Sequence, residues 1–266
     1  MAKESIIDDS RPNAGRMYDY YLGGNHNFEV DRQAADQVIK LLPFAPKYAR
    51  LQRWALQDIA VNLVEERKFD VIIDFASGLP TNDHVHHLVP DGTTVIYSDH
   101  DPVVVEYGHD ILEGTPNAYF FEGNAAEPEA LLNRAEVKEI LAGRRKVGLI
   151  FWGVTAFLTD EEIDNATSYL YEWAAPGSCL AFNAQLADVP QTPTTKQIEE
   201  IYKRMGSVAR LRPLEQFHKL VTPWQLEKDG FVPLLEWHGF DQSELSKMDV
   251  EDFGPLGGGF GAYLIK

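Results

Sequence analysis

Residues 71–83 read VIIDFASGLPTND, an apolar run that contains the acid Asp74 near its end and continues into a turn around Gly78. An apolar run followed by Gly, Pro, Thr and Asn is typical of a buried strand that ends in a loop. A carboxylate at the end of such a strand is costly unless it is paired or hydrogen-bonded. Asp74 either holds its own turn through backbone amides or marks a strand end that opens onto a ligand. This stretch alone favours neither interpretation.

The chain from about residue 70 onward alternates short apolar runs with helical patterns, which predicts an α/β domain with a mostly parallel sheet. Strands are expected at residues 70–75, 94–98, 118–122, 147–152 and 178–184. Helices are expected near residues 82–89, 101–112, 127–141, 160–174, 194–207 and 222–229. Two late runs, at residues 231–238 and 259–265, are expected to form an antiparallel pair at one sheet edge.

The first 68 residues have a different pattern. Residues 33–67 show helical periodicity that is broken at Pro43 and Pro46, whereas residues 11–32 fit neither a helical nor a strand period well. We expect residues 1–68 to form an N-terminal helical cap that packs on an α/β domain of residues 69–266.

The composition excludes several classes of partner. The 266 residues include 24 basic and 41 acidic side chains, a formal net charge of −17, so a phosphate backbone would be repelled and no nucleic acid is expected. No apolar run approaches the roughly 20 residues of a membrane-spanning helix, and no membrane association is expected. The N-terminal residues lack the pattern of a secretory signal, and Cys179 is the single cysteine. These features favour a cytoplasmic location.

Polar residues follow three consecutive predicted strands. Asp74 and the turn after it end the first strand, Asp99 ends the second, and Gly123 and Asn124 follow the third. Ligands of doubly wound sheets bind outside the carboxyl ends of the strands. A carboxylate at the second strand end can accept hydrogen bonds from both ribose hydroxyls, and Asn124 follows at the position of an adenine edge. The three strand ends together predict a nucleoside site.

The turn after the first strand indicates which nucleoside ligand is expected. Residues 76–81 read ASGLPT, with one glycine, one proline and no basic residue close by. A dinucleotide fingerprint needs G-x-G-x-x-G so that a pyrophosphate can lie on a helix N-terminus. The turn therefore favours a ligand without phosphates, such as S-adenosylmethionine, whose ammonium and sulfonium charges suit an acid such as Asp74.

Four segments resemble a family of class I S-adenosylmethionine-dependent methyltransferases that was long catalogued as a domain of unknown function. They are NAGRMYDYYLGGNHNFEVDR at 13–32, DFASGLPT at 74–81, YSDHDPVV at 97–104 and GNAAEPEALL at 123–132. The resemblance covers nearly the whole chain. It implies a Rossmann-like fold with a mostly parallel seven-stranded sheet, an antiparallel edge hairpin and an N-terminal helical cap. It also implies S-adenosylmethionine as the cofactor and an acceptor that the sequence does not identify, expected to be a small molecule.

The resemblance also implies roles for particular residues. The segment from Asp74 to Gly78 would line the methionine and ribose side of the cofactor, Asp99 would bind the ribose hydroxyls, and Asn124 would border the adenine. From the cap, Arg16 is expected to pair with the methionine carboxylate, and a tyrosine of residues 18–21 to lie near the transferring methyl group. The residues expected to contact the cofactor are Arg16, Tyr21, Asp74, Ala76, Ser77, Gly78, Asp99, His100, Asn124, Ala125 and Gly153.

Two positions depart from the family's pattern and leave alternatives open. Asn124 stands where an aspartate is usual, and Ala156 where a histidine is usual near the end of the fourth strand. Asn124 can still accept from the adenine amino group, but no general base and no catalytic residue is assigned. These two changes leave a non-catalytic S-adenosylmethionine-binding or regulatory protein as an alternative. A nicotinamide-dependent oxidoreductase shares the strand-end acid and is a second alternative, although the missing G-x-G-x-x-G and the proline in the turn count against it. The spacing of His84, His86 and His87 does not predict a metal site, and both a monomer and a homodimer are compatible with the sequence.

Overall fold

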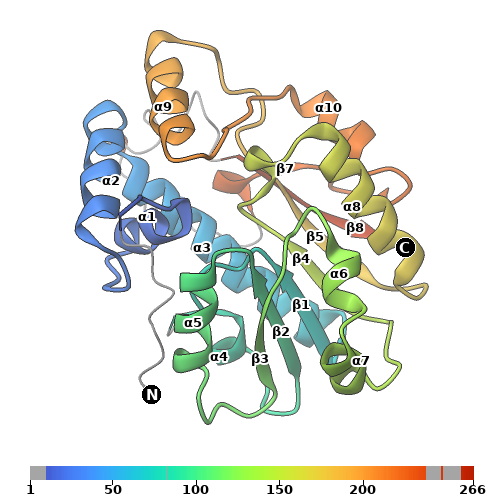
Figure 1. The fold of residues 1–266 in the computed structure, drawn as a ribbon. Helices are drawn as coiled ribbons and strands as arrows, with labels where there is room; N and C mark the ends of the chain where they lie inside the picture. The colour runs from blue at the N-terminus through green and yellow to red at the C-terminus, as the bar shows by residue number, and fades with distance from the viewer. Residues whose placement is uncertain (1–9, 82, 238–246, 248–258) are drawn as a thin grey trace.

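The centre of the molecule is a mixed sheet, seen in a computed structural model that describes residues 10–81, 83–237, 247 and 259–266 (Figure 1). The strand order is β3-β2-β1-β4-β5-β8-β6, and β7 pairs with β8 as well. Strands β1 to β5 are parallel, and β8 runs antiparallel to β5, β6 and β7. This confirms the predicted α/β class and mostly parallel sheet. The strands are β1 (Val71–Phe75), β2 (Thr94–Asp99), β3 (Ala118–Glu122), β4 (Gly148–Phe151), β5 (Cys179–Ala184), β6 (Gln225–Leu226), β7 (Val232–Pro233) and β8 (Phe260–Ile265).

The predicted antiparallel pairing of the two late runs is confirmed by β7 and β8, but the described residues form eight strands rather than seven. The strand predicted at 231–238 is reduced to β7 and continues into the 3₁₀ helix η3 (Leu234–Glu236); residue 238 lies outside the described residues. The helix predicted at 222–229 is wrong, since β6 forms there. The buried Trp224 donates its indole N–H to the Thr167 carbonyl at 2.8 Å, so a tertiary contact overrides the local helical pattern.

Helices cover both faces of the sheet. The helix predicted at 127–141 is divided at Asn133 and Arg134, and the helix predicted at 82–89 is a single turn. The helix at residues 214–220 was not predicted. On one face lie α3 (Ala45–Val61) with its π-helical extension η1 (Asn62–Glu66), α4 (Val85–Leu88) and α5 (Pro102–Ile111). On the other lie α6 (Pro128–Leu132), α7 (Ala135–Leu141), α8 (Asp160–Trp173) and α10 (Leu214–Leu220).

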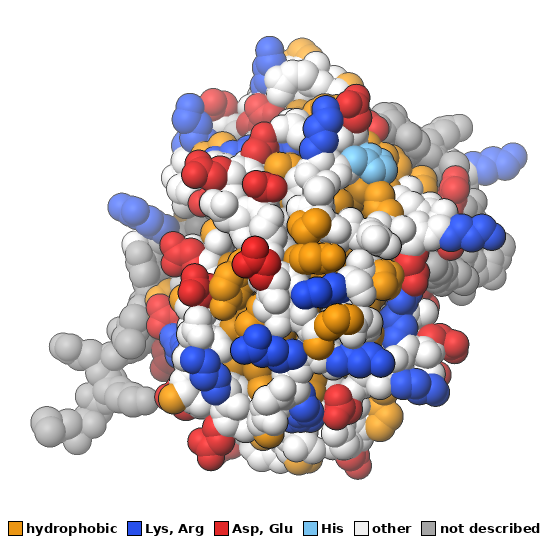
Figure 2. Space-filling view, turned by 90° about the vertical axis from the view of Figure 1, so that its right-hand side faces the viewer, with side chains coloured by type: hydrophobic (Ala, Val, Ile, Leu, Met, Phe, Trp, Pro, Cys, Tyr) orange, Lys and Arg blue, Asp and Glu red, His pale blue; other side chains and the backbone are white. Residues whose placement is uncertain are grey.

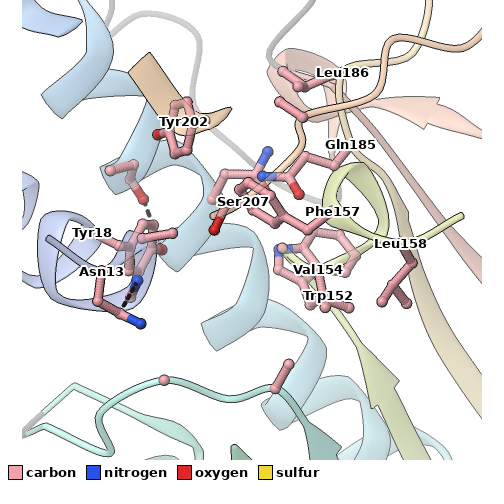
Figure 3. A pocket seen from close by; sticks show the side chains of 18 of the residues that line it. Asn13, Tyr18, Trp152, Val154, Phe157, Leu158, Gln185, Leu186, Tyr202 and Ser207 are labelled. Atoms are coloured by element: carbon pink, nitrogen blue, oxygen red, sulfur yellow. Dashed lines mark hydrogen bonds between the residues drawn. The ribbon is translucent and has the colours of Figure 1, made fainter. Parts of the chain in front are cut away.

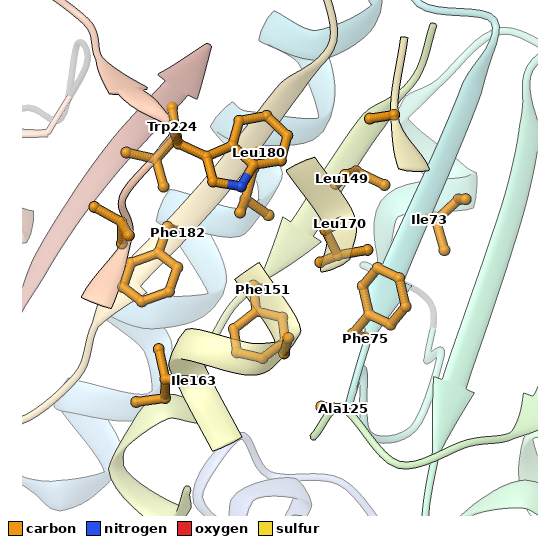
Figure 4. Packing of buried hydrophobic residues seen from close by; sticks show 14 of the residues in the cluster. Ile73, Phe75, Ala125, Leu149, Phe151, Ile163, Leu170, Leu180, Phe182 and Trp224 are labelled. Atoms are coloured by element: carbon orange, nitrogen blue, oxygen red, sulfur yellow. The ribbon is translucent and has the colours of Figure 1, made fainter. Parts of the chain in front are cut away.

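The core forms two apolar layers because both faces of the parallel strands are buried. Ile73 and Phe75 of β1 pack toward α8, whereas Ile72 packs toward α3. In the layer under α8, the rings of Phe151 and Phe182 stack with their centroids 6.0 Å apart (Figure 4). Burial on both faces explains why these strands read as continuous apolar runs in the sequence. The free Cys179 lies inside this core, as predicted.

The cap is built from helices that are distant in the sequence. α1 (Ala14–Tyr21), α2 (Glu29–Leu41) and α9 (Pro193–Arg204) bury one apolar cluster together with the start of α3. α1 was not expected from its periodicity; Asn13 caps it, with its side-chain oxygen accepting from the backbone of Gly15 and Arg16. The predicted break at Pro43 is confirmed, but Pro46 lies in the first turn of α3. The rest of α3 packs on the sheet, so the cap and the sheet share this helix.

The surface over α6, α7 and α8 carries acidic and basic side chains together (Figure 2). The basic ones gather across the lower half of this view. Among the basic side chains, Arg145 places its guanidinium 5.6 Å from the ring centroid of Trp173. Among the described residues, none of the helices has both the length and the hydropathy that a membrane span requires.

Candidate functional site

A cavity of about 530 Å³ lies between the cap and the carboxyl ends of the parallel strands. Figure 3 shows its walls, with Tyr18 and Asn13 on the cap side and Trp152, Phe157 and Leu158 opposite them. Most residues predicted from the sequence to contact the cofactor line this cavity. They are Tyr21 from the cap, Ala76, Ser77 and Gly78 after β1, Asp99 and His100 after β2, Asn124 and Ala125 after β3, and Gly153 after β4.

The turn after β1 exposes its backbone to the cavity. Ala76 and Gly78 have φ values of +55° and +66°, in the left-handed region that non-glycine residues seldom adopt. The Ser77 N–H donates to the Ser98 carbonyl at 2.9 Å, which ties the turn to β2. A Cβ added at Gly78, or at Gly153 with φ +72°, would meet nothing within 4 Å. Both glycines therefore let a ligand approach the main chain closely.

Asp99 is held rigidly at the end of β2. Its Oδ2 accepts from the Gly78 N–H at 3.1 Å, and its Oδ1 accepts from the Asp101 N–H at 3.0 Å. Burial raises the pKa of Asp99, while the hydrogen bond from Asp101 and the nearby His100 act in the opposite direction. Each carboxylate oxygen keeps a further lone pair, so Asp99 can accept two hydroxyls from the cavity side.

Asn124 forms a turn of its own after β3. Its Oδ1 accepts from the Ala126 N–H at 3.0 Å, and the residue is exposed at the edge of the cavity. This bond uses one lone pair of the oxygen and leaves the two amide N–H groups to donate. Asn124 can therefore offer both a donor and an acceptor to the edge of a base.

Asp74, in contrast, does not line the cavity. It is 1% exposed, its Oδ2 has no hydrogen-bond partner among the described residues, and it is paired in register with Tyr97 of β2. Burial raises the pKa of Asp74 well above its usual value, opposed by the charge of Arg53. The structure thus places this carboxyl group beneath the lining, as a buried acid rather than a contact surface.

Arg16 also lies off the cavity. Its Nε is 2.8 Å from Asp31 Oδ2, its Nη1 is 3.4 Å from Asp101 Oδ2, and its Nη2 donates to the Arg11 carbonyl at 2.6 Å. Its guanidinium also lies 5.2 Å from the ring centroid of Phe28. With these partners, the predicted pairing of Arg16 with a ligand carboxylate has no geometric support.

Arg53 on α3 is a candidate site residue that the sequence analysis missed. It lines the cavity, its side chain is 4% exposed, and its Nη1 lies 3.1 Å from Asp83 Oδ1. Its Nε has no hydrogen-bond partner among the described residues. The sequence contained a pattern that could have identified Arg53. The residues of α3 that line the cavity recur at helical spacing, and polar side chains such as Arg53 interrupt a face that is otherwise apolar. This lining face consists of Ala45, Tyr48, Ala49, Gln52, Arg53 and Leu56.

Ala156 lies in the 3₁₀ helix η2 (Thr155–Phe157) and is fully buried. It is not part of the lining, although its neighbour Phe157 is. The small Ala156 side chain fits this closed core.

Comparison with known proteins defines the family. The sequence model described as S-adenosyl methyltransferase matches residues 1–259. The chain belongs to this S-adenosyl methyltransferase family. The protein is therefore an S-adenosylmethionine-dependent methyltransferase, as the sequence predicted. No curated protein matches the chain.

Solved structures of similar proteins agree with this family. A proposed methyltransferase from Thermobifida fusca YX is 27% identical, with a TM-score of 0.84 over 97% of this chain and 96% of the other. A DUF574 family protein from Streptomyces avermitilis MA-4680 is 22% identical, with a TM-score of 0.84 over 97% of this chain and 99% of the other. The second likeness supports the fold alone.

The cavity of this methyltransferase fits S-adenosylmethionine. Asp99 provides a carboxylate in a fixed position at the end of β2. Gly78 and Gly153 have no side chain between their backbone and the cavity, and Arg53 provides a buried positive charge. The cofactor supplies a methyl group on an electrophilic sulfonium. Within the described ranges, no group of three or more His, Cys, Asp or Glu side chains could hold a metal ion.

Proposed function

We propose that the cofactor lies across the ends of β1, β2 and β3, with its ribose on Asp99 and its adenine beside Asn124 and Ala125. The observation that carries this placement is the Asp99 carboxylate, which the Gly78 and Asp101 N–H groups hold in a fixed orientation at the cavity wall. A carboxylate held in this way loses little entropy when it accepts the ribose hydroxyls.

The methionine carboxylate is proposed to bind Arg53 rather than Arg16. Arg53 lines the same cavity as Ser77 and Gly78, and its Nε lacks a hydrogen-bond partner among the described residues. A guanidinium can bind a carboxylate through two parallel hydrogen bonds, which positions as well as attracts it. The buried Asp74 beneath it adds negative charge near the ammonium and sulfonium end whenever it is ionised.

The residues of the cavity act by position rather than by acid–base chemistry. The strand ends fix the cofactor, and the cap helices close the cavity above it, so that an acceptor held by the cap faces the methyl carbon. Holding the two reactants in line can lower the barrier by roughly 7–11 kcal/mol in favourable cases. No lining residue among those described is assigned as a general base.

The acceptor is proposed to be a small molecule. The enclosed cavity supports this, as does the net charge of −17, which opposes binding of a nucleic acid. The single cysteine supports a cytoplasmic location.

Methyl transfer from methyl-labelled S-adenosylmethionine to small-molecule fractions tests this function. We expect label in an extractable small molecule, with formation of S-adenosylhomocysteine in equal amount. Tight cofactor binding without transfer to any fraction would favour the non-catalytic alternative. Binding of NAD in preference to S-adenosylmethionine would contradict the proposal.

A further inference from the structure

One end of the cavity, beside the end of β4, has aromatic walls. Trp152 follows β4, Phe157 belongs to η2 and Tyr202 comes from α9 (Figure 3). Tyr48 of α3 lines the same cavity. The rings of Phe157 and Tyr202 lie 5.7 Å apart at an angle of 47°. We call Tyr48, Trp152, Phe157 and Tyr202 the aromatic end of the cavity. Aromatic faces pack best on flat rings, so this end suits a planar ligand.

Two charged side chains at the aromatic end, Glu162 and Arg210, are hydrogen-bonded to neighbouring residues. Glu162 lines the cavity, but its Oε2 accepts from the Thr159 N–H at 2.7 Å and from the Thr159 hydroxyl at 2.9 Å. Arg210 donates its Nη1 to the carbonyls of Phe157 and Val208, at 2.8 and 3.0 Å. Burial raises the pKa of the Tyr48 and Tyr202 hydroxyls, so both stay neutral. A ligand carboxylate would lose hydration among these rings, and the Arg210 guanidinium already donates to two carbonyls.

Three polar atoms at this end need partners. The indole N–H of Trp152 and the Oε1 of Gln185 are buried without a hydrogen bond among the described residues. The Tyr48 hydroxyl lies near the amides of Gln52 and Gln185 but forms no hydrogen bond of normal geometry. An indole N–H can only donate, and an amide oxygen can only accept. A ligand that reaches these atoms would need both an acceptor and a donor.

From this geometry we infer that the aromatic end is the acceptor site, and that the acceptor is a neutral, planar aromatic molecule with a nitrogen nucleophile. The inference rests on the function proposed above. Among the described lining residues at this end, none is an unengaged carboxylate or imidazole that could first remove a proton. A nitrogen lone pair needs no such step.

The transfer balances without a base. The nitrogen lone pair forms a bond to the methyl carbon while the carbon–sulfur bond breaks, and its electron pair goes to sulfur. The products are S-adenosylhomocysteine and a methylated nitrogen that carries the positive charge. An N–H proton on that nitrogen is released to water when the product leaves. The faces of Trp152 and the tyrosines stabilise this charge as it develops.

The test uses neutral one- and two-ring aromatic amines, led by 5-aminoindole, with the matched probes 5-hydroxyindole and indole-5-carboxylate. Binding is measured at pH 8 to the protein saturated with S-adenosylhomocysteine, and transfer is measured with labelled S-adenosylmethionine. We expect the amines to bind and to be methylated on nitrogen, and the carboxylate to bind at least tenfold more weakly. Equal binding of the carboxylate, methylation of the hydroxyl probe at the rate of the amine, or no methylation of any amine would overturn the inference.

The variant Gln185→Leu tests the site itself. We expect it to weaken amine binding about fivefold or more and to leave S-adenosylhomocysteine binding unchanged. Gln191→Leu, on an exposed loop, is the matched control and should change neither. If the unmodified protein does not bind S-adenosylhomocysteine, the proposed function is wrong. Unchanged amine binding in Gln185→Leu, with cofactor binding intact, would contradict only the acceptor site.

Discussion

Arg16 Nε and Asp31 Oδ2 lie 2.8 Å apart, and both side chains are buried under the cap. The same Asp31 accepts from the backbone N–H groups of Asn13 and Phe28, each at 2.8 Å. Through Asp101, which caps the start of α5, Arg16 also joins the cap to the sheet layer. The segment 13–32, which the sequence singled out as a ligand-binding signature, therefore has a structural function around this ion pair.

Arg16→Ala should lower the free energy of unfolding by about 3–5 kcal/mol, because it leaves the buried Asp31 carboxylate without its charged partner. Chemical denaturation measures this loss. Lys203→Ala, which removes an exposed ion pair with Glu200, should cost less than about 1 kcal/mol. An Arg16→Ala protein that is as stable as the wild type but has lost only S-adenosylmethionine binding would restore the role predicted from the sequence.

Arg53→Ala should weaken S-adenosylmethionine binding by about 10- to 150-fold, the equivalent of losing a hydrogen bond to a charged group worth about 1.5–3 kcal/mol. Adenosine lacks the carboxylate, so its affinity should change little. Isothermal titration with both ligands measures the difference. Arg50→Ala, on the exposed side of the same helix, is the control. Equal losses for the two ligands would show that Arg53 does not contact the carboxylate.

Asp74→Asn should remove a pH-dependent destabilisation. Burial raises the folded-state pKa of Asp74 well above its usual value, whereas in the unfolded chain it is about 3.9. The folded state therefore holds a proton that the unfolded state has lost, and the stability of the wild type falls as the pH rises through the folded-state pKa. Asparagine resembles the protonated acid, so the variant should match the wild type at acid pH and exceed it at higher pH. A difference that does not depend on pH would refute this account, and thermal denaturation across a pH series measures it.

Gly153→Ala and Gly143→Ala form a matched pair. Both glycines have left-handed φ values, +72° and +81°, and a Cβ at either position would meet nothing within 4 Å. Each substitution should cost about 1–2 kcal/mol of stability from backbone strain alone. Only Gly153 lines the cavity, so only its variant should also weaken cofactor binding. Similar affinities for the two variants would place Gly153 outside the site.

Much of the sheet was predictable because burial on both faces gives parallel strands continuous apolar runs, as in β1 and β4. The strand-end residues Gly78, Asp99 and Asn124 were predictable for a related reason, since strand ends in such a sheet meet at one edge.

Other features depend on contacts between distant segments. The helix predicted at 222–229 does not form, and Trp224 instead donates a hydrogen bond to Thr167 of α8. α9 packs in the cap although it begins more than 150 residues after α2 ends (193 − 41 = 152). The position of Arg53, rather than Arg16, on the cavity wall has the same origin. Both are arginines in helical segments, and which one reaches the cavity is decided by the position of Asp31 and by the rotation of α3.

The central claim is that the cofactor's ribose binds Asp99, and titration of Asp99→Asn with S-adenosylhomocysteine and adenosine tests it most directly. Asparagine keeps one acceptor for the turn but loses the charge, so both ligands should bind about tenfold or more weakly while the fold stays intact. Glu122→Gln, at the exposed end of β3, should bind both ligands as the wild type does. Unchanged affinity in a folded Asp99→Asn protein would contradict the placement of the cofactor at these strand ends.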